Sequence, residues 1–300
     1  MKDDRITLKN NVHDCALVFE GGGYRAAYTA GMANVLLEQD IYFDEVVGIS
    51  AGASHAVDYL SRDQSRIHRS FIDLAGKREA GGIWSFLHGH GFFNATYDYQ
   101  GCVDDGYMPF DWDSFIENPA HIRIQAFERD TGRTVSFTRE SMQTLERMMM
   151  CVRASSSLPG MMRPISINGQ VMLDGGLGIG AGIPTHLAEM DGYHKIFFLA
   201  TRPKGYRKVP EAERVQRLYK QWGRRYPYMA EALLTRWSRY NKAIDHLETL
   251  ENEGLALVVR PDEMAIKSTT LNTEKLRRAY TMGHNQGVRE LPQWEKFLFG

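Results

Sequence analysis

Short runs of apolar residues alternate along this chain with longer segments whose apolar positions recur at helical spacing. Residues 15–19 (CALVF) and 45–49 (EVVGI) have the composition of buried strands, and residues 25–39 have the pattern of a helix between them. A second helix is predicted from residue 51, and further strands at 122–128, 133–138, 195–201 and 255–261. This alternation predicts an α/β protein with a largely parallel sheet and helices on both faces.

Residues 163–176 (RPISINGQVMLDGG) show a different pattern. Two alternating runs flank the pair Asn168-Gly169, which is the residue pair that a tight two-residue hairpin turn prefers. We therefore predict a β-hairpin here, whose second strand ends at Asp174.

Two regions lack the strand and helix alternation. Residues 76–118 are rich in glycine, aromatic and acidic residues with weak periodicity, which predicts an irregular insertion or a lid. Residues 202–242 carry twelve Lys or Arg against three Glu, a local balance of 12 − 3 = +9, interleaved with Tyr and Trp on a helical pattern. We therefore expect a core at 14–201 and a basic, mostly helical extension at 202–300 that packs on it.

The bulk composition narrows the class of protein. The 300 residues are 43% hydrophobic and 24% charged, with a formal net charge of −1, which gives no global reason to expect nucleic acid binding. Residues 1–14 lack the apolar core of a signal peptide, and no apolar run is long enough for a membrane span. The three cysteines are far apart and form neither a disulfide framework nor a metal pair, so we expect a cytoplasmic protein.

Three glycines directly follow the first predicted strand. Gly21, Gly23 and Ala26 fit the dinucleotide-binding pattern G-x-G-x-x-G/A between a strand and a helix. That pattern also needs an acid near the end of the second strand to hold the ribose. Here Asp44 and Glu45 stand at its beginning. Nucleotide binding is therefore an alternative interpretation of the glycine run.

The second strand ends instead in Gly48-Ile49-Ser50-Ala51-Gly52, a G-x-S-x-G sequence between a strand and a helix. In this context the pattern predicts a sharp turn that exposes a nucleophilic serine. Both strands of a βαβ unit run the same way, so their carboxyl ends share one edge of the sheet. The N–H groups of Gly21, Gly22 and Gly23 would then converge on an oxyanion beside Ser50.

A nucleophilic serine needs a base, and two kinds of residue could serve. The usual base is a histidine, and the chain has ten, none of them in a strand-end motif. Asp174 ends an alternating strand. Gly175 and Gly176 follow it and permit other segments of the chain to approach closely. A carboxylate in a partly desolvated pocket could accept the serine proton directly. Spacing alone leaves both candidates open.

Three motifs in this order, "GGGYR", "GISAG" and "DGG", resemble the signatures of patatin-like phospholipases, and "ASSSLPGMMRPI" (154–165) resembles the segment before their aspartate strand. The resemblance covers roughly residues 14–201. It implies a three-layer α/β/α sandwich and a Ser–Asp dyad without histidine. Ser50 would be the nucleophile, Asp174 the base, the glycine run the oxyanion hole, and Arg25 the basic residue that follows it.

The resemblance further implies hydrolysis of fatty acyl esters in lipids, without a metal or another cofactor. The segment from about 202 onward is similar to the C-terminal extension of a bacterial cytoplasmic branch of the family. Its charge and aromatic residues favour peripheral contact with an anionic membrane, or a solvated structural face. A catalytically silent lipid-binding or partner-binding protein on the same fold is a further alternative. The sequence does not indicate an oligomeric state.

Overall fold

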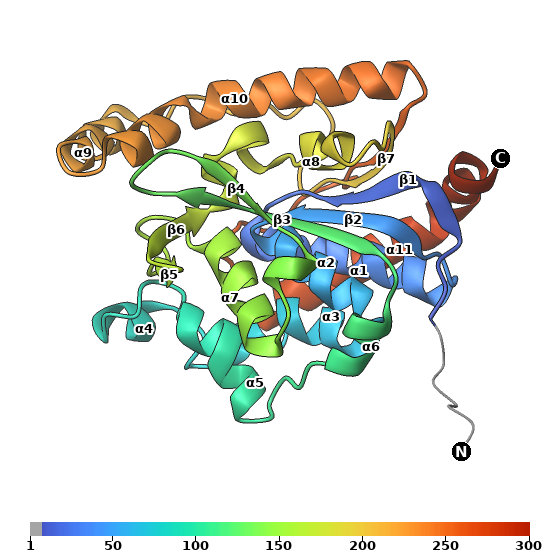
Figure 1. Ribbon diagram of the computed structural model, residues 1–300, viewed down its shortest axis with the longest axis horizontal. Coiled ribbons are helices and arrows are strands. Elements are labelled where there is room, and N and C mark those ends of the chain that lie inside the picture. Colours follow the sequence, from blue (N-terminus) through green and yellow to red (C-terminus); the bar gives the residue numbers. More distant parts are fainter. Residues whose placement is uncertain (1–7) are drawn as a thin grey trace.

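The computed structural model describes residues 8–300, and its central sheet is covered by helices on both faces (Figure 1). The strands are β1 (Val12–Phe19), β2 (Phe43–Ile49), β3 (His121–Glu128), β4 (Thr134–Phe137), β5 (Ile165–Ile167), β6 (Gln170–Asp174), β7 (Lys195–Leu199) and β8 (Ala256–Val259). Every strand that the apolar pattern predicts is present. The predicted hairpin is confirmed as β5 and β6, with Asn168 and Gly169 both at positive φ in the turn.

The helices form the two outer layers. They are α1 (Ala26–Glu38), α2 (Ala51–Leu60), α3 (Gln64–Phe71), α4 (Ile83–Leu87), α5 (Cys102–Asp104), α6 (Trp112–Glu117), α7 (Leu145–Ser156), α8 (Thr185–Met190), α9 (Glu213–Gly223), α10 (Pro227–Asn252) and α11 (Thr273–Phe299). In Figure 1, α1, α2, α3, α7 and α11 lie on one side of the sheet, and α8 and α10 lie on the other. This arrangement confirms the three-layer α/β/α sandwich.

The strand order is β5-β6-β3-β2-β1-β7-β8, with β4 paired to β3 beside this path. The pairs β1 with β2, β1 with β7, β2 with β3 and β7 with β8 are parallel. The strands β4 and β6 run antiparallel to β3. The sheet is therefore mainly parallel, and its antiparallel strands are confined to one end.

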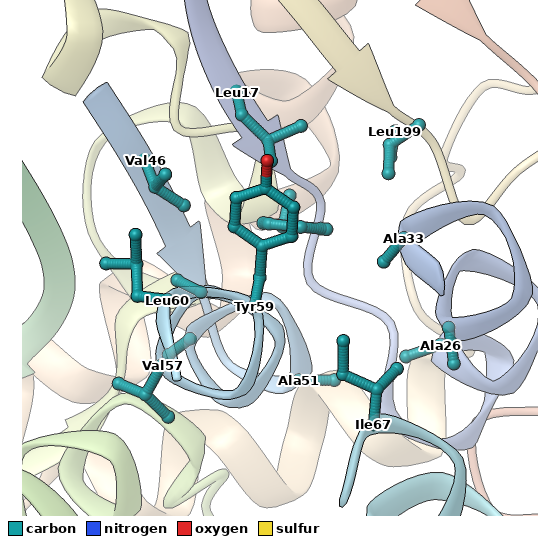
Figure 2. Close-up of a cluster of buried hydrophobic side chains, with 14 of the residues drawn as sticks. Leu17, Ala26, Ala33, Val46, Ala51, Val57, Tyr59, Leu60, Ile67 and Leu199 are labelled. Carbon is teal, nitrogen blue, oxygen red and sulfur yellow. The ribbon is translucent and has the colours of Figure 1, made fainter. Parts of the chain in front are cut away.

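Buried strands with both faces covered explain the continuous apolar runs in the sequence. Along β1, Leu17 and Phe19 belong to the hydrophobic cluster under α1 and α2, whereas Ala16 and Val18 belong to the cluster under α8 and α10. Figure 2 shows the first of these clusters. The ring of Tyr59 on α2 points toward β1 there, and its hydroxyl donates a 2.5 Å hydrogen bond to the Ile41 carbonyl.

The C-terminal segment is built into this architecture. The strand β8 extends the sheet beyond β7, and α11 packs along α1. The two helices approach most closely at a pair of glycines. A Cβ on Gly31 would overlap the Tyr280 carbonyl oxygen, and a Cβ on Gly283 would overlap the Tyr28 carbonyl oxygen. Only glycine permits backbones to approach this closely, so these positions fix how the last helix docks.

Residues 76–118 contain only short helical pieces. These are α4, a π-helical turn at Tyr97–Gly101, α5 and α6, joined by bends and turns. Within residues 8–300, no helix combines the length and the apolar character needed to cross a bilayer. The first half of the polar N-terminal segment, residues 1–7, lies outside the described residues.

Candidate active site

The sheet itself brings Ser50 and Asp174 together. The strand β4 pairs with Ile124–Phe127 of β3, so β2 and β6 must share the opposite edge of β3. On that edge β2 ends with Ile49 opposite Gln125, and antiparallel β6 ends with Asp174 opposite Ala126. The carboxyl ends of two strands therefore meet head to head on neighbouring residues of one strand.

Ser50 lies in a strained turn between β2 and α2. Its backbone has φ 58° and ψ −126°, a conformation that non-glycine residues rarely adopt. Strain of this kind is expected where a turn lifts a serine hydroxyl clear of the sheet. The flanking glycines make the turn possible, since a Cβ on Gly48 would overlap Gly52, and a Cβ on Gly52 would overlap the Phe19 carbonyl.

The Ser50 hydroxyl donates a 2.8 Å hydrogen bond to Oδ2 of Asp174. The other carboxylate oxygen, Oδ1, accepts a 2.7 Å hydrogen bond from the Gly176 N–H. This second bond fixes the carboxylate, so that one oxygen faces the serine. Gly175 can lie here only because it has no side chain, since a Cβ would overlap the Gln125 carbonyl oxygen.

Asp174 is 2% exposed, and burial raises the pKa of its carboxyl above the ordinary range. Arg236, the hydrogen bonds from Ser50 and Gly176, and Lys208 act in the opposite direction, in that order of size, but burial outweighs them. A carboxylate with a raised pKa is a stronger base than an exposed one. The environment therefore favours transfer of a proton from the serine to Asp174.

No histidine of residues 8–300 is hydrogen-bonded to Ser50 or Asp174. The ring of His55 lies among Phe19 and Phe71, its Nε2 lies within hydrogen-bond distance of Thr29 Oγ1 and the Ala26 carbonyl, and burial lowers its pKa to about 3. His186 lies against the Gln125 side chain, and burial lowers its pKa to about 4. Both rings are structural in this arrangement. Of the two candidate bases that the sequence left open, the geometry favours Asp174.

The glycine run lies directly beside the serine. A Cβ on Gly21 would be 3.3 Å from the Ser50 Cβ, and a Cβ on Gly22 would be 2.7 Å from the Thr201 side chain. Gly23 has φ 54°, in the region that favours glycine. The shape of the loop is therefore set by its close approach to Ser50 and to Thr201, which lies just after β7.

One of the three expected oxyanion donors is already in use. The Gly21 N–H donates a 3.0 Å hydrogen bond to the Gly182 carbonyl, so this amide is not available to an oxyanion in the structure. Within the described part of the chain, the N–H groups of Gly22 and Gly23 make no hydrogen bond to protein. The expectation for Gly21 as a donor is therefore corrected. Gly21 provides space, and Gly22 and Gly23 remain the candidate donors.

Ser50 and Asp174 open onto a cavity of about 680 Å³, a volume in the range of small-molecule sites. Part of its lining is apolar and includes Val57, Phe71 and Met149. The irregular insertion also contributes to it, through Phe93 and Tyr99. Among the described residues, no group of three or more His, Cys, Asp or Glu side chains is placed to hold a metal ion.

Arg25 lines the same cavity and is only 9% exposed. Its pKa is lowered to about 10, first by burial and then by the nearby charge of Arg202. The sequence has Arg25 two residues after the glycine run, and its supporting role beside the oxyanion loop stays a prediction. Sequence reasoning did not predict that cations from the C-terminal extension would lie beside it.

Two supporting residues were missed from the sequence. The Ser155 hydroxyl accepts a 2.8 Å hydrogen bond from the Ser50 N–H, which braces the strained turn. The Gln125 side-chain amide donates to the carbonyls of Gly175 and Ile179, at 2.7 and 2.8 Å, and holds the loop after Asp174. The "ASSSLP" segment was the available signal for Ser155. No sequence pattern marked Gln125, which lies inside a buried strand.

Comparison with known proteins places the site in a family. Residues 17–188, more than half of the chain, match the model of patatin-like phospholipases. Residues 226–299 match a second model, described as a domain of unknown function (DUF6363). The Ser50 turn, Asp174 and the glycine loop all fall within the first match.

Individual relatives are distant. The Escherichia coli protein named "Uncharacterized protein YjjU" is 25% identical over 201 residues, which are 65% of this chain and 54% of that protein. The chain thus spans about half the length of this curated relative. The crystal structure of VipD from Legionella pneumophila has a TM-score of 0.48 and 12% identity, covering 98% of this chain and 72% of that one. On the family match over residues 17–188, the chain belongs to the patatin-like phospholipases.

Proposed function

We propose that this protein is a serine acyl hydrolase that cleaves carboxylic esters of lipids through Ser50 and Asp174. The observation that carries the proposal is the 2.8 Å hydrogen bond from the Ser50 hydroxyl, held in a strained turn, to a buried carboxylate with a raised pKa. Membership of the patatin-like phospholipases supports a lipid ester as the substrate. The apolar part of the cavity lining supports an acyl chain as part of it.

In the proposed reaction, Ser50 Oγ attacks the ester carbonyl carbon while Asp174 accepts the hydroxyl proton. The N–H groups of Gly22 and Gly23 donate hydrogen bonds to the oxyanion that develops on the carbonyl oxygen. Asp174 then returns the proton to the departing alcohol, which leaves an acyl group on Ser50. Water attacks this acyl-enzyme, Asp174 accepts a proton from the water, and the fatty acid leaves as Ser50 recovers its proton.

A fluorophosphonate probe tests the nucleophile. We expect the wild-type protein to be labelled at Ser50 and to hydrolyse p-nitrophenyl esters, and Ser50→Ala to lose both properties while its circular dichroism spectrum is unchanged. Failure of labelling together with tight NAD binding would support the nucleotide alternative. Lipid binding without labelling or hydrolysis would support the silent binding protein.

Peripheral contact with an anionic membrane remains part of the proposal. On α9 and just after it, Lys220, Arg224 and Arg225 are exposed cations. At the same end of the molecule in Figure 1, α4 exposes apolar side chains, including Phe86 at 62% and Leu87 at 70%. Cations attract anionic headgroups and apolar side chains enter the interface. This end of the molecule is therefore the surface we propose for contact with lipid.

A further inference from the structure

Five cationic side chains line the cavity that contains Ser50, and four of them have no ion-pair partner among the described residues, since only Arg66 is paired, with Asp58. Arg25 follows the glycine loop, Arg202 follows β7, Lys208 lies between β7 and α9, and Arg236 lies on α10. Three of the four therefore come from the C-terminal extension, outside the segment that matches the patatin-like family model. We call these four side chains the cationic cluster.

Arg236 shows how near the cationic cluster is to the reacting groups. A Cβ added to Gly176 would lie 2.6 Å from Nη2 of Arg236 and 2.9 Å from Oδ1 of Asp174. Among the nearby charges, that of Arg236 has the largest effect on the pKa of Asp174, which it lowers. A ligand group held by this guanidinium is therefore placed next to the ester that Ser50 attacks.

The charges of the cationic cluster are not neutralised by the protein. Among residues 8–300, no carboxylate oxygen lies within 4.0 Å of a charged nitrogen of any of the four. The Nε atoms of Arg25, Arg202 and Arg236 are buried and make no hydrogen bond within the same residues. Buried donors without partners are costly, and they are expected where a ligand supplies the acceptor.

Other arginines of the same segment behave differently. Arg207 forms ion pairs with Glu248 at 2.7 Å and with Asp245 at 3.1 Å. Arg239, on the helix that carries Arg236, donates hydrogen bonds to the carbonyls of Leu177 and Ala232, the first at 2.8 Å and the second at 2.6 Å. These side chains use their donors to hold the fold together. In the described part of the chain, the side chains of the cationic cluster donate no hydrogen bond to the protein.

Aromatic rings hold two members of the cationic cluster in place without cancelling their charge. The Arg202 guanidinium lies 4.0 Å from the centre of the Tyr206 ring, and the Lys208 ammonium lies 4.1 Å from that of Tyr240. The nearby acid Glu20 accepts hydrogen bonds from the Thr201 N–H and the Tyr240 hydroxyl. Its carboxylate attracts the cluster through space but does not pair with it.

The positive charges of the cationic cluster repel one another across the cavity. The pKa of Lys208 is held well below its ordinary value, first by burial and then by the charge of Arg236, with smaller effects of Arg25 and Arg202. Like charges in a partly desolvated space raise the free energy of the empty site. An anion that entered would remove this repulsion and satisfy the free donors together.

We propose that Arg25, Arg202, Lys208 and Arg236 bind the phosphate of an acyl-ester substrate, and that a doubly charged phosphate monoester is preferred to a zwitterionic or a neutral headgroup. This assignment rests on the proposed ester hydrolysis at Ser50. Four cations beside two acids, Glu20 and the ionised Asp174, leave a surplus of two positive charges, which matches a dianion better than a headgroup without net charge. The substrate class is therefore an acylglycerol phosphate, with its ester between the phosphate and the acyl chain.

The lining of the cavity offers groups for both ends of such a molecule. The cationic cluster comes from the glycine loop, the segment after β7 and α10, whereas α2, α3 and α7 contribute apolar side chains such as Val57, Phe71 and Val152 together with the Arg66–Asp58 ion pair. A headgroup at the cationic cluster and an acyl chain along these apolar side chains would leave the ester beside Ser50. Polar groups that fix orientation and apolar walls that bind the rest are typical of such sites.

The first experiment measures binding without catalysis. Inorganic phosphate is titrated into the full-length Ser50→Ala protein and into the same protein carrying Arg202→Gln or Lys208→Gln, with calorimetry as the readout. We expect binding to the Ser50→Ala protein and weakening by about tenfold for each cation removed. Lys204→Gln and Arg224→Gln, exposed cations outside the cavity, are the matched controls and should leave the affinity unchanged. Absence of binding, or equal weakening by the controls, would overturn the proposal.

The second experiment distinguishes a lipid headgroup from free phosphate. The value of kcat/KM is measured for a monoacylglycerol phosphate and for the monoacylglycerol with the same acyl chain. We expect the wild-type enzyme to favour the phosphate by about a hundredfold or more, and each variant, Arg202→Gln or Lys208→Gln, to lower that ratio by about tenfold. If phosphate binds but the ratio is near one, the site serves a free anion and the headgroup assignment is wrong.

The two experiments also distinguish failure of phosphate binding by the cationic cluster from failure of the proposed ester hydrolysis at Ser50. If Ser50 is not a nucleophile, neither ester is cleaved, although phosphate still binds to the cationic cluster. If the cationic cluster does not bind the phosphate headgroup, both esters are cleaved at similar rates. Circular dichroism and thermal melting of each variant exclude loss of the fold as the cause of either result.

Discussion

Ser50 and Asp174 are 124 positions apart in the chain, yet the hydroxyl of one donates a 2.8 Å hydrogen bond to the carboxylate of the other. Their proximity follows from β2 and β6 ending head to head on one edge of β3. The pair is therefore positioned by strand pairing within the sheet. Its geometry should persist in variants that change only the reacting atoms.

The first prediction concerns how the two residues act together. Ser50→Ala and Asp174→Asn should each lower kcat/KM for an ester by at least about a thousandfold, and the double variant should be little slower than either one, because the two groups act as a unit. Steady-state kinetics with a p-nitrophenyl ester measures this. Additive losses would contradict a shared step. A mild effect of Asp174→Asn together with a severe effect of a histidine variant would show that the base is elsewhere.

The second prediction concerns the pH dependence of the rate. Asp174 must be ionised to accept a proton, and burial raises its pKa, so kcat should rise with pH through a value above that of an ordinary aspartate. Arg236 lowers this pKa. Arg236→Gln should therefore move the rising limb to higher pH, by about one unit. Arg224→Gln, which removes an exposed cation, should leave the limb in place, and a shift to lower pH in Arg236→Gln would contradict the assignment of the base.

The third prediction concerns Glu45, which lies in β2 with no exposed surface and with neither carboxylate oxygen hydrogen-bonded within the described residues. Burial, and then the nearby charge of Asp191, raise its pKa to about 8. The unfolded chain releases this proton near pH 4.3, so the wild-type protein should lose stability as the pH rises from about 4.3 to about 8.

Glu45→Gln should remove that loss. Its free energy of unfolding should exceed that of the wild type by an amount that grows across this pH range, to on the order of 1–4 kcal/mol. Urea denaturation at several pH values gives the comparison. Glu231→Gln, at an exposed position, is the control, and its free energy of unfolding should change with pH as that of the wild type does. A difference that is constant with pH would mean that Glu45 does not titrate in this range.

The fourth prediction concerns the docking of the last helix. A Cβ on Gly283 would overlap the Tyr28 carbonyl of α1, so Gly283→Ala must push α11 away from α1. We expect a loss of stability on the order of 3 kcal/mol, measured by thermal or urea unfolding. Thr281→Ala, on the exposed face of α11, should change stability by less than about 0.5 kcal/mol. Equal effects of the two substitutions would show that the helices do not meet at this glycine.

The fifth prediction concerns membrane contact. Replacing Lys220, Arg224 and Arg225 by Glu should weaken sedimentation with vesicles that contain phosphatidylserine, most strongly at low salt, because screening shortens the reach of these charges. Phe86→Glu with Leu87→Glu should weaken it at every salt concentration, since buried apolar area is lost.

Lys296→Glu is the control for these variants, since it lies on α11 near the chain end marked C, away from α9 in Figure 1. It should sediment like the wild type. If the wild-type protein ignores anionic vesicles even at low salt, the exposed cations and the apolar side chains of α4 are structural features only.

The sequence indicates the candidate reacting residues more fully than the residues that surround them. The glycine run, Ser50 and Asp174 were identifiable because each follows an apolar strand, and the carboxyl ends of parallel strands meet at one edge. The meeting of β2 and β6 on β3 was not visible, since it depends on pairing between distant strands. The same applies to Ser155 and Gln125, whose contacts with the turn and the loop arise only when those strands assemble.

The C-terminal extension shows a second limit. The charge balance of +9 over its residues 202–242 was evident, but a count of charges does not say which side chains face inward. Arg202 and Lys208 line the cavity, whereas Arg207 forms ion pairs on the surface of α10. Helical periodicity marks a face within one helix, but these residues lie in the connection before α9, where no period applies.

The cavity is lined by two parts of the chain that match separate family models, at 17–188 and 226–299, and by residues of the segment between them, 202–222. The first part holds the groups proposed to break the bond, and α10 in the second holds Arg236. Apart from Arg25, the groups proposed for the reaction and those proposed for headgroup recognition thus lie in different stretches of sequence. A chimaera that kept residues 8–201 and took its remaining segment from a relative should inherit the chemistry of the first parent and the headgroup preference of the second, which would make this extension an exchangeable selectivity module.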